Sequence, residues 1–284
     1  MNKPVGLFSA ILITFLLAGC GVHSTVSPTV EPPSPSIQAE PLDVHKAKPM
    51  PEMSQHPQED ADIPRTYHGP VPILMYHSIH SDPKNTLMVS PDTFEAEMQH
   101  LKDTGYHAIT FKDLEDWKEG RPLPSKPIII TFDDGYKDNY TVAFPVLKRL
   151  GLKATIFVVS GFVGGKNNLS WDEIKEMQQS GVIEIGAHTV SHLDLTKLSE
   201  KQKWEEIHGS KVAIEEQIGC PVIAFAYPAG RYDDATVKET EKAGFEFAVT
   251  TRNGLATPQQ GLLTLHRIRV PGNESAEAFA KEFP

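Results

Sequence analysis

The chain has 284 residues, of which 39% are hydrophobic and 23% are charged, so it has the composition of a folded protein with one large or two small domains. Its formal net charge of −10 argues against a nucleic-acid partner, because such a partner requires a basic face. With only two cysteines, Cys20 and Cys220, an internal disulfide is not expected to stabilise the fold.

Residues 1–19 have the form of a lipoprotein signal peptide. Lys3 supplies a basic start, residues 5–17 are almost wholly apolar, and small residues precede Cys20. This ending resembles a bacterial lipobox, which implies cleavage before Cys20 and a lipid on its thiol. The protein would then be extracytoplasmic and anchored to the bacterial cell membrane by acyl chains. The alternative is an ordinary cleavage site followed by a chance cysteine.

Residues 20–66 contain nine prolines and many Ser, Glu, Gln and Thr residues. Such a composition buries too little apolar surface to offset chain entropy, so it predicts a disordered tether. Residues 67–284 are then a single catalytic domain. Within that domain we interpret Cys220 as a small buried apolar residue and not as a nucleophile.

Apolar runs and helical patterns alternate after the tether. The apolar runs predict strands at 71–76, 127–132, 154–159, 182–185, 222–227, 245–250 and 263–270. Helical periodicity predicts helices at 91–104, 111–119, 139–150, 171–180, 199–218, 233–243 and 275–283. Because largely apolar strands alternate with helices, the pattern predicts an α/β fold with parallel strands.

Two acidic residues, Asp133 and Asp134, come directly after the apolar run at 127–132. Adjacent like charges repel. A divalent cation bound to one carboxylate offsets this repulsion and leaves the other carboxylate free as a base. His188 and His192 follow another apolar run with a spacing of four, so they can face one ion. We therefore predict that Asp134, His188 and His192 ligate one metal ion. The alternative interpretation is a strand-end turn or helix cap.

These stretches resemble the polysaccharide deacetylases, the family that shares the chitooligosaccharide-deacetylase homology domain. The sequence TFDDG at 131–135 followed by HTVSH at 188–192 matches the family signature, and the likeness runs from about residue 71 to residue 270. The stretches PILMYHSI at 72–79 and FAYPAGRY at 225–232 are most similar to the branch that deacetylates poly-N-acetylglucosamine. The resemblance implies a distorted (β/α)7 barrel of the deacetylase type.

The resemblance also implies roles for particular residues. The first acid of the pair, Asp133, would be the general base, and the second, Asp134, the metal ligand. Many members carry an arginine that orients the base, at a position that corresponds here to Ala226. Arg231 or Arg269 could take its place.

A general acid is also needed, because the departing amine must gain a proton. His77 ends the first apolar run in a Tyr-His-Ser context, as in the poly-N-acetylglucosamine branch, and we favour it over His266 near the end of the chain. The backbone N–H near Ala229 would help to hold the oxyanion. Tyr227 and Trp171 would stack on sugar rings, and the alternative is that these aromatic residues pack in the core or at its rim.

The sequence therefore predicts a metal-dependent hydrolase that removes N-acetyl groups from N-acetylglucosamine residues of an extracellular polysaccharide. Poly-β-1,6-N-acetylglucosamine is the favoured substrate, and peptidoglycan or chitin oligomers are next. The alternatives are an O-acetyl esterase for xylan-like polymers and a non-catalytic cell-wall-binding lipoprotein. We expect one divalent metal ion, preferably zinc, although iron, cobalt and nickel suit the same ligands. We expect a monomer.

Overall fold

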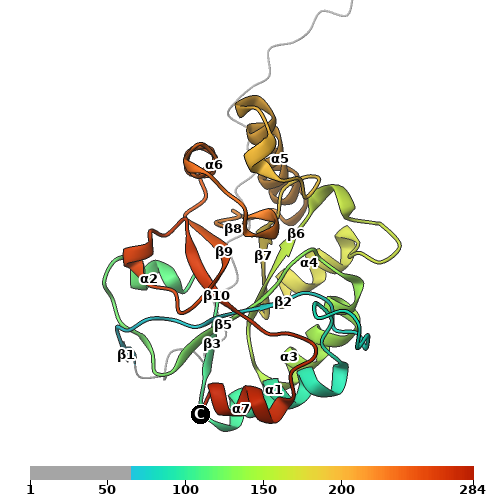
Figure 1. Cartoon of the computed structure of the whole chain (residues 1–284), viewed down its shortest axis with the longest axis vertical. Helices are drawn as coiled ribbons and strands as arrows, with labels where there is room; N and C mark the ends of the chain where they lie inside the picture. The colour runs from blue at the N-terminus through green and yellow to red at the C-terminus, as the bar shows by residue number, and fades with distance from the viewer. Residues whose placement is uncertain (1–64) are drawn as a thin grey trace, which may run out of the picture. The chain divides into compact units, whose positions relative to one another are not determined.

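The structure, a computed structural model, describes residues 65–284 (Figure 1). The predicted signal peptide, the lipidation site Cys20 and nearly all of the predicted tether lie outside these residues, so they remain predictions. In the part of the chain that is described, no helix is both long and apolar enough to cross a membrane.

Seven parallel strands close into a barrel, which confirms the predicted (β/α)7 architecture (Figure 1). Their order around the barrel is β2-β10-β9-β8-β7-β6-β5, and the pairing of β5 with β2 completes the ring. Each strand overlaps one of the seven predicted strand regions, and β7 and β9 end two and three residues later than predicted. The strands are β2 (Ile73–Tyr76), β5 (Pro127–Phe132), β6 (Ala154–Val158), β7 (Ile183–Ala187), β8 (Ala224–Ala226), β9 (Phe247–Asn253) and β10 (Leu265–Arg269).

Three short strands were not predicted. β3 (His107–Ile109) pairs with the first half of β5, whereas β6 pairs with the second half. The barrel is distorted at this position, because two strands share the pairing with β5. β1 (Arg65–Tyr67) and β4 (Leu123–Pro124) form a separate antiparallel pair.

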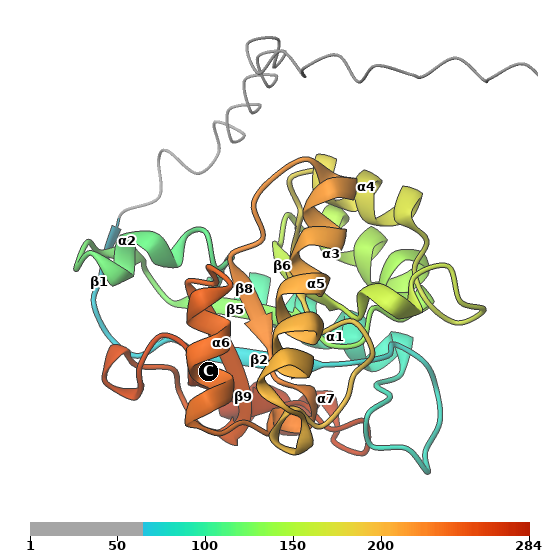
Figure 2. The same cartoon turned by 90° about the horizontal axis from the view of Figure 1, so that it is seen from above.

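Helices lie near the predicted positions around the barrel, and Figure 2 shows α5 (Glu200–Ile218) and α6 (Asp234–Lys242) next to each other. Ser170 and Ser199 form the predicted capping boxes at the starts of α4 and α5. The predicted helix at 139–150 is divided into a π-helix, η2 (Asn139–Ala143), and an α-helix, α3 (Phe144–Leu150). The other α-helices of the described residues are α1 (Pro91–Asp103), α2 (Leu114–Lys118), α4 (Trp171–Gln179), α5 (Glu200–Ile218), α6 (Asp234–Lys242) and α7 (Ala276–Glu282).

Strand alternation decides which side chains enter the barrel. Along β5, Ile129 packs in the apolar cluster inside the barrel, whereas Ile128 and Ile130 pack in the cluster that includes the surrounding helices. Because successive residues alternate sides, Asp133 continues the inward series at the carboxyl end of the strand. The carboxyl ends of barrel strands are where enzymes of this architecture place their reacting groups.

Candidate active site

Asp133 lies at the carboxyl end of β5 and is only 3% exposed. Its two carboxylate oxygens accept hydrogen bonds of 2.7 Å each from Nη1 and Nη2 of Arg267 on β10. The Arg267 side chain is itself fixed, because its Nε donates to the carbonyl of Thr250 and Nη1 also donates to the hydroxyl of Thr131. This bidentate geometry holds the carboxylate in one orientation.

The Arg267 pair also decides the charge of Asp133. Burial raises the pKa of the carboxyl, but the guanidinium charge and its hydrogen bonds outweigh burial and hold the pKa well below its ordinary value. Asp133 is therefore ionised at neutral pH, as a general base must be.

Asp134, His188 and His192 converge as predicted, with one ligand atom from each lying within 4.8 Å of the others. The Nε2 atoms of His188 and His192 each lie 3.5 Å from Oδ1 of Asp134. Three residues in these loops have left-handed backbone, with φ of 72° at Asp134, 66° at Thr189 and 54° at His192. Such backbone is costly for residues other than glycine, and here it turns the ligand side chains toward one another.

The donor set fits a divalent metal ion. His188 is 2% exposed, and its Nδ1 lies 2.7 Å from the carbonyl oxygen of Ala226, which fixes the ring with Nε2 facing Asp134. Burial also lowers the pKa of His188, which favours the neutral imidazole that a metal requires. Two imidazoles and one carboxylate that leave further positions open are typical of a catalytic metal site.

His77 follows β2 and lies next to Asp133, with 3.9 Å between Nε2 of His77 and Oδ2 of Asp133. Burial lowers the pKa of His77, and the Asp133 carboxylate opposes that effect. His77 thus belongs to the same cluster as Asp133 and the candidate metal ligands. His266 has a different position, because it alternates with Arg267 on β10 and its backbone N–H donates to the side chain of Gln260.

The arginine that holds Asp133 is neither of the two we expected. Arg231 is exposed and pairs with Asp194 at 2.7 Å, and Arg269 donates to the hydroxyl of Thr86. Arg267, which was not among the predicted residues, makes the contact instead. Arg267 lies two residues after the apolar Leu265, so strand alternation places both side chains on the same face and would have predicted that Arg267 faces inward.

Tyr227 does not have the exposed ring that sugar stacking requires, so that prediction is wrong. The side chain is fully buried, its hydroxyl donates to the carbonyl of Leu263, and its ring stacks on Tyr232. Ala229 is exposed in a turn at Pro228–Gly230 and has a φ of 51°, so its backbone is strained as in the ligand loops. The cysteine at 220 is half-buried, and thus more exposed than predicted.

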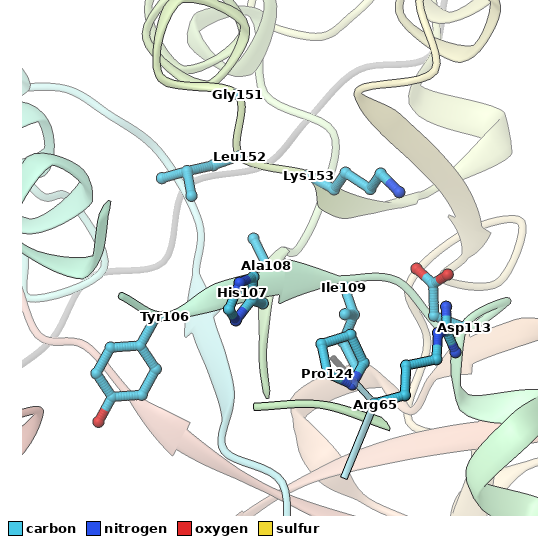
Figure 3. Close-up of a pocket in the computed structure, with 10 residues that line it drawn as sticks. All are labelled: Arg65, Tyr106, His107, Ala108, Ile109, Asp113, Pro124, Gly151, Leu152 and Lys153. Atoms are coloured by element: carbon cyan, nitrogen blue, oxygen red, sulfur yellow. The ribbon is translucent and has the colours of Figure 1, made fainter. Parts of the chain in front are cut away.

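Two cavities lie away from these residues. One cavity, of about 100 Å³, lies near β3. Arg65 and Asp113 line one end of it and Tyr106 lines the other (Figure 3). The other, of about 570 Å³, includes Pro72 and Pro127, which lie at the beginnings of β2 and β5. Because the candidate site lies at the carboxyl ends of the strands, neither cavity is part of it.

Comparison with known proteins agrees with this geometry. The family profile described as polysaccharide deacetylase matches residues 120–248. A relative from Bacillus subtilis (strain 168), the "Putative polysaccharide deacetylase YxkH", is 43% identical over 210 residues, which cover 74% of this chain and 74% of the relative. The chain belongs to the polysaccharide deacetylase family.

Two further proteins resemble the deacetylase. The poly-beta-1,6-N-acetyl-D-glucosamine N-deacetylase of Staphylococcus epidermidis is 28% identical over 209 residues, which cover 69% of this chain and 72% of the relative. The structure of Streptococcus pyogenes deacetylase PplD in complex with acetate superposes with a TM-score of 0.72 and 35% identity, covering 76% of this chain and 99% of that chain. These comparisons confirm the predicted family and the class of enzyme.

Proposed function

We propose that the deacetylase hydrolyses N-acetyl groups on N-acetylglucosamine residues of an extracellular polysaccharide, with poly-β-1,6-N-acetylglucosamine as the favoured polymer. The observation that carries the proposal is the position of an ionised, arginine-held Asp133 beside the Asp134, His188 and His192 cluster. Similarity to the Staphylococcus epidermidis enzyme supports the choice of polymer.

The side chains of the cluster divide the hydrolysis among them. A divalent metal ion held by Asp134, His188 and His192 would polarise the acetyl carbonyl and make water a better nucleophile. Asp133 accepts a proton from the attacking water. The water oxygen bonds to the carbonyl carbon, the carbon–nitrogen bond breaks, and acetate leaves.

His77 completes the proton transfers by donating to the departing nitrogen, which leaves as the free amine. Its position near Asp133 supports this role, since the group that donates must reach the same reacting centre as the base. The exposed backbone at Ala229 is our candidate for the N–H that stabilises the oxyanion. Zinc is the preferred metal, and iron, cobalt and nickel suit the same ligands.

Acetate release from the purified protein tests this function. The substrates would be poly-N-acetylglucosamine, peptidoglycan, chitin oligomers and O-acetylated xylan, each assayed before and after a chelator and then with added zinc, cobalt or nickel. We expect release from the first polymer, loss with the chelator and recovery with metal. Faster release from O-acetylated xylan would favour an esterase, and no release with intact polymer binding would favour a non-catalytic lipoprotein.

Substitution of Asp133→Asn tests the base. We expect kcat to fall by roughly 10²–10⁴-fold, the usual contribution of general acid–base catalysis. Asp172→Asn, which changes an exposed acid at the start of α4, is the matched control and should retain activity. Unchanged acetate release by Asp133→Asn would refute the assignment.

We also propose that a lipid on Cys20 anchors the deacetylase at the outer face of a bacterial cell membrane and that it acts as a monomer. The signal-like sequence at residues 1–19 supports the anchor. Cys20→Ser should move the protein from the membrane fraction to the soluble fraction and abolish labelling by a fatty acid. Retention of the label would contradict this assignment.

A further inference from the structure

Two consecutive residues after the Asp133–Asp134 loop hold the chain segment that carries His77. Nδ2 of Asn139 donates to the carbonyl oxygen of His77 at 2.8 Å. Oδ2 of Asp138 accepts from the hydroxyl of Ser78 at 2.6 Å, and Oδ1 accepts from the backbone N–H of Ile79 at 2.9 Å. The three residues that follow β2 are thus bound by the side chains of Asp138 and Asn139, which we call the Asp138–Asn139 clamp.

The local backbone is adapted to this contact. Asn139 is fully buried and is the first residue of the π-helix η2. A π-helical turn is rare, and it often marks a functional site. The Asn139 amide directs its Nδ2 toward His77, and its Oδ1 is buried without a hydrogen-bond partner among residues 65–284.

The clamp connects the proposed acid to the base. The backbone N–H of Asp133 donates to the carbonyl of Tyr76, the residue before His77, at 3.0 Å. The carbonyl of His77 itself is held by Asn139 from the other end of the same loop. The backbone of His77 is therefore fixed on both sides relative to the Asp133 carboxylate, which lies 3.9 Å from its Nε2.

We propose that Asp138 and Asn139 are positioning residues for the general acid His77. This inference rests on the role proposed above for His77. The clamp does not touch the reacting atoms, and it acts by holding the His77 backbone so that the imidazole faces the departing nitrogen. Small displacements of a catalytic group reduce the rate strongly while leaving substrate binding nearly unchanged.

Kinetics of clamp variants test the inference. Asn139→Ala and Asp138→Ala should each lower kcat by about 10- to 100-fold with little change in KM. Asp138→Asn should recover much of the rate, because its amide oxygen can still accept from Ile79. Asn167→Ala, which removes an exposed side chain on the neighbouring loop, is the matched control.

A double-mutant cycle distinguishes positioning from a general loss of structure. In a His77→Ala background the acid is already absent, so adding Asn139→Ala should lower kcat by less than about threefold further. An equal loss in both backgrounds would overturn the proposal. Affinity for zinc, measured by competition with a chelating dye, should stay within about threefold of the wild-type value, because among residues 65–284 no side-chain hydrogen bond joins the clamp to Asp134, His188 or His192.

Hydrogen exchange provides a readout that does not depend on turnover. Asp138→Ala should raise exchange at the amide of Ile79 while that of β5 stays protected, and unchanged exchange would overturn the clamp. If Asn139→Ala fails to fold, Ser78→Ala removes one clamp contact with a smaller disturbance and should show the same pattern to a lesser extent. Failure of the wild-type protein to release acetate would overturn the proposed function, and exchange would still decide whether the clamp holds this segment.

Discussion

Two buried carboxyls on opposite sides of β2 show how the same fold lowers the pKa of one acid and raises the pKa of another. The hydroxyl of Tyr76 donates to Oε2 of Glu97 at 2.9 Å, and the next residue, His77, lies beside Asp133. Glu97 is 1% exposed and Asp133 is 3% exposed, so both have lost nearly all contact with solvent. The main difference is the group that faces each acid.

Burial raises the pKa of both acids, and for Asp133 the main group that reverses this effect is Arg267. For Glu97, burial raises the pKa to about 7, the hydrogen bond from Tyr76 only partly opposes this, and the charge of Glu274 adds to it. For Asp133 the guanidinium of Arg267 outweighs burial. The charge of the proposed base is therefore produced by a residue on another strand, and not by the strand that carries it.

Removal of Arg267 should raise the pKa of Asp133, as burial does for Glu97, and it should cause the largest loss of stability that we expect. Arg267→Met leaves a buried carboxylate without its partner, which typically costs about 3–5 kcal/mol of stability. Urea unfolding at pH 7 measures the loss. Arg149→Met is the matched control, since its ion pair with Glu95 is exposed and should contribute less than about 1 kcal/mol.

The pH dependence of the Arg267 variant sharpens the comparison. In the wild-type protein the depressed pKa of Asp133 contributes stability that is present above the ordinary aspartate pKa and is lost as the pH falls. Arg267→Met should remove that contribution and move the acidic limb of kcat/KM to higher pH, because the base must be ionised. Arg267→Met with Asp133→Asn should be more stable than Arg267→Met alone. A less stable double variant would contradict this account.

Glu97→Gln tests the raised pKa of Glu97, the other buried acid of the comparison. A raised pKa in the folded state stabilises the protonated form, so its contribution is present below the ordinary pKa of 4.5 and is lost as the pH rises to about 7. A shift of this size corresponds to about 3 kcal/mol. Relative to the wild type, Glu97→Gln should therefore gain about 3 kcal/mol in unfolding free energy between pH 4 and pH 8.

The control for this variant is Glu95→Gln, in the same helix, whose side chain is exposed. Unfolding free energies from urea titrations at both pH values give the comparison. If Glu97→Gln and the wild type lose stability in parallel as the pH rises, Glu97 is already ionised in the folded protein and the contrast with Asp133 is wrong.

The sequence was sufficient for the parts of the molecule that depend on local pattern. Seven apolar runs predicted the seven barrel strands, and the strand-end acids predicted which of them carry the site. Asp134, His188 and His192 converge because parallel strands bring their carboxyl ends to one face of the barrel. That consequence of topology can be derived before any distance is known.

What the sequence did not reveal depends on contacts between distant segments. Arg267 and Asp133 are 134 positions apart, and only the closed barrel brings their strands to the same interior. The three-residue strand β3 has too little pattern of its own, and its pairing with β5 determines it. Tyr227 ends an apolar run, but the neighbouring Tyr232 and Leu263 decide that its ring is covered.

The smallest effect we expect comes from Tyr227→Phe, which tests that last correction. Loss of the hydroxyl leaves the Leu263 carbonyl without this donor, so stability should fall by about 1 kcal/mol. The KM for the polymer should stay the same, because the buried ring does not reach substrate. Tyr140→Phe, which removes a hydroxyl bonded to Glu176 at the surface, should cost less and is the matched control. A severalfold rise in KM for Tyr227→Phe with unchanged stability would mean that Tyr227 opens to the sugar during turnover, and the original assignment of this residue to substrate binding would then stand.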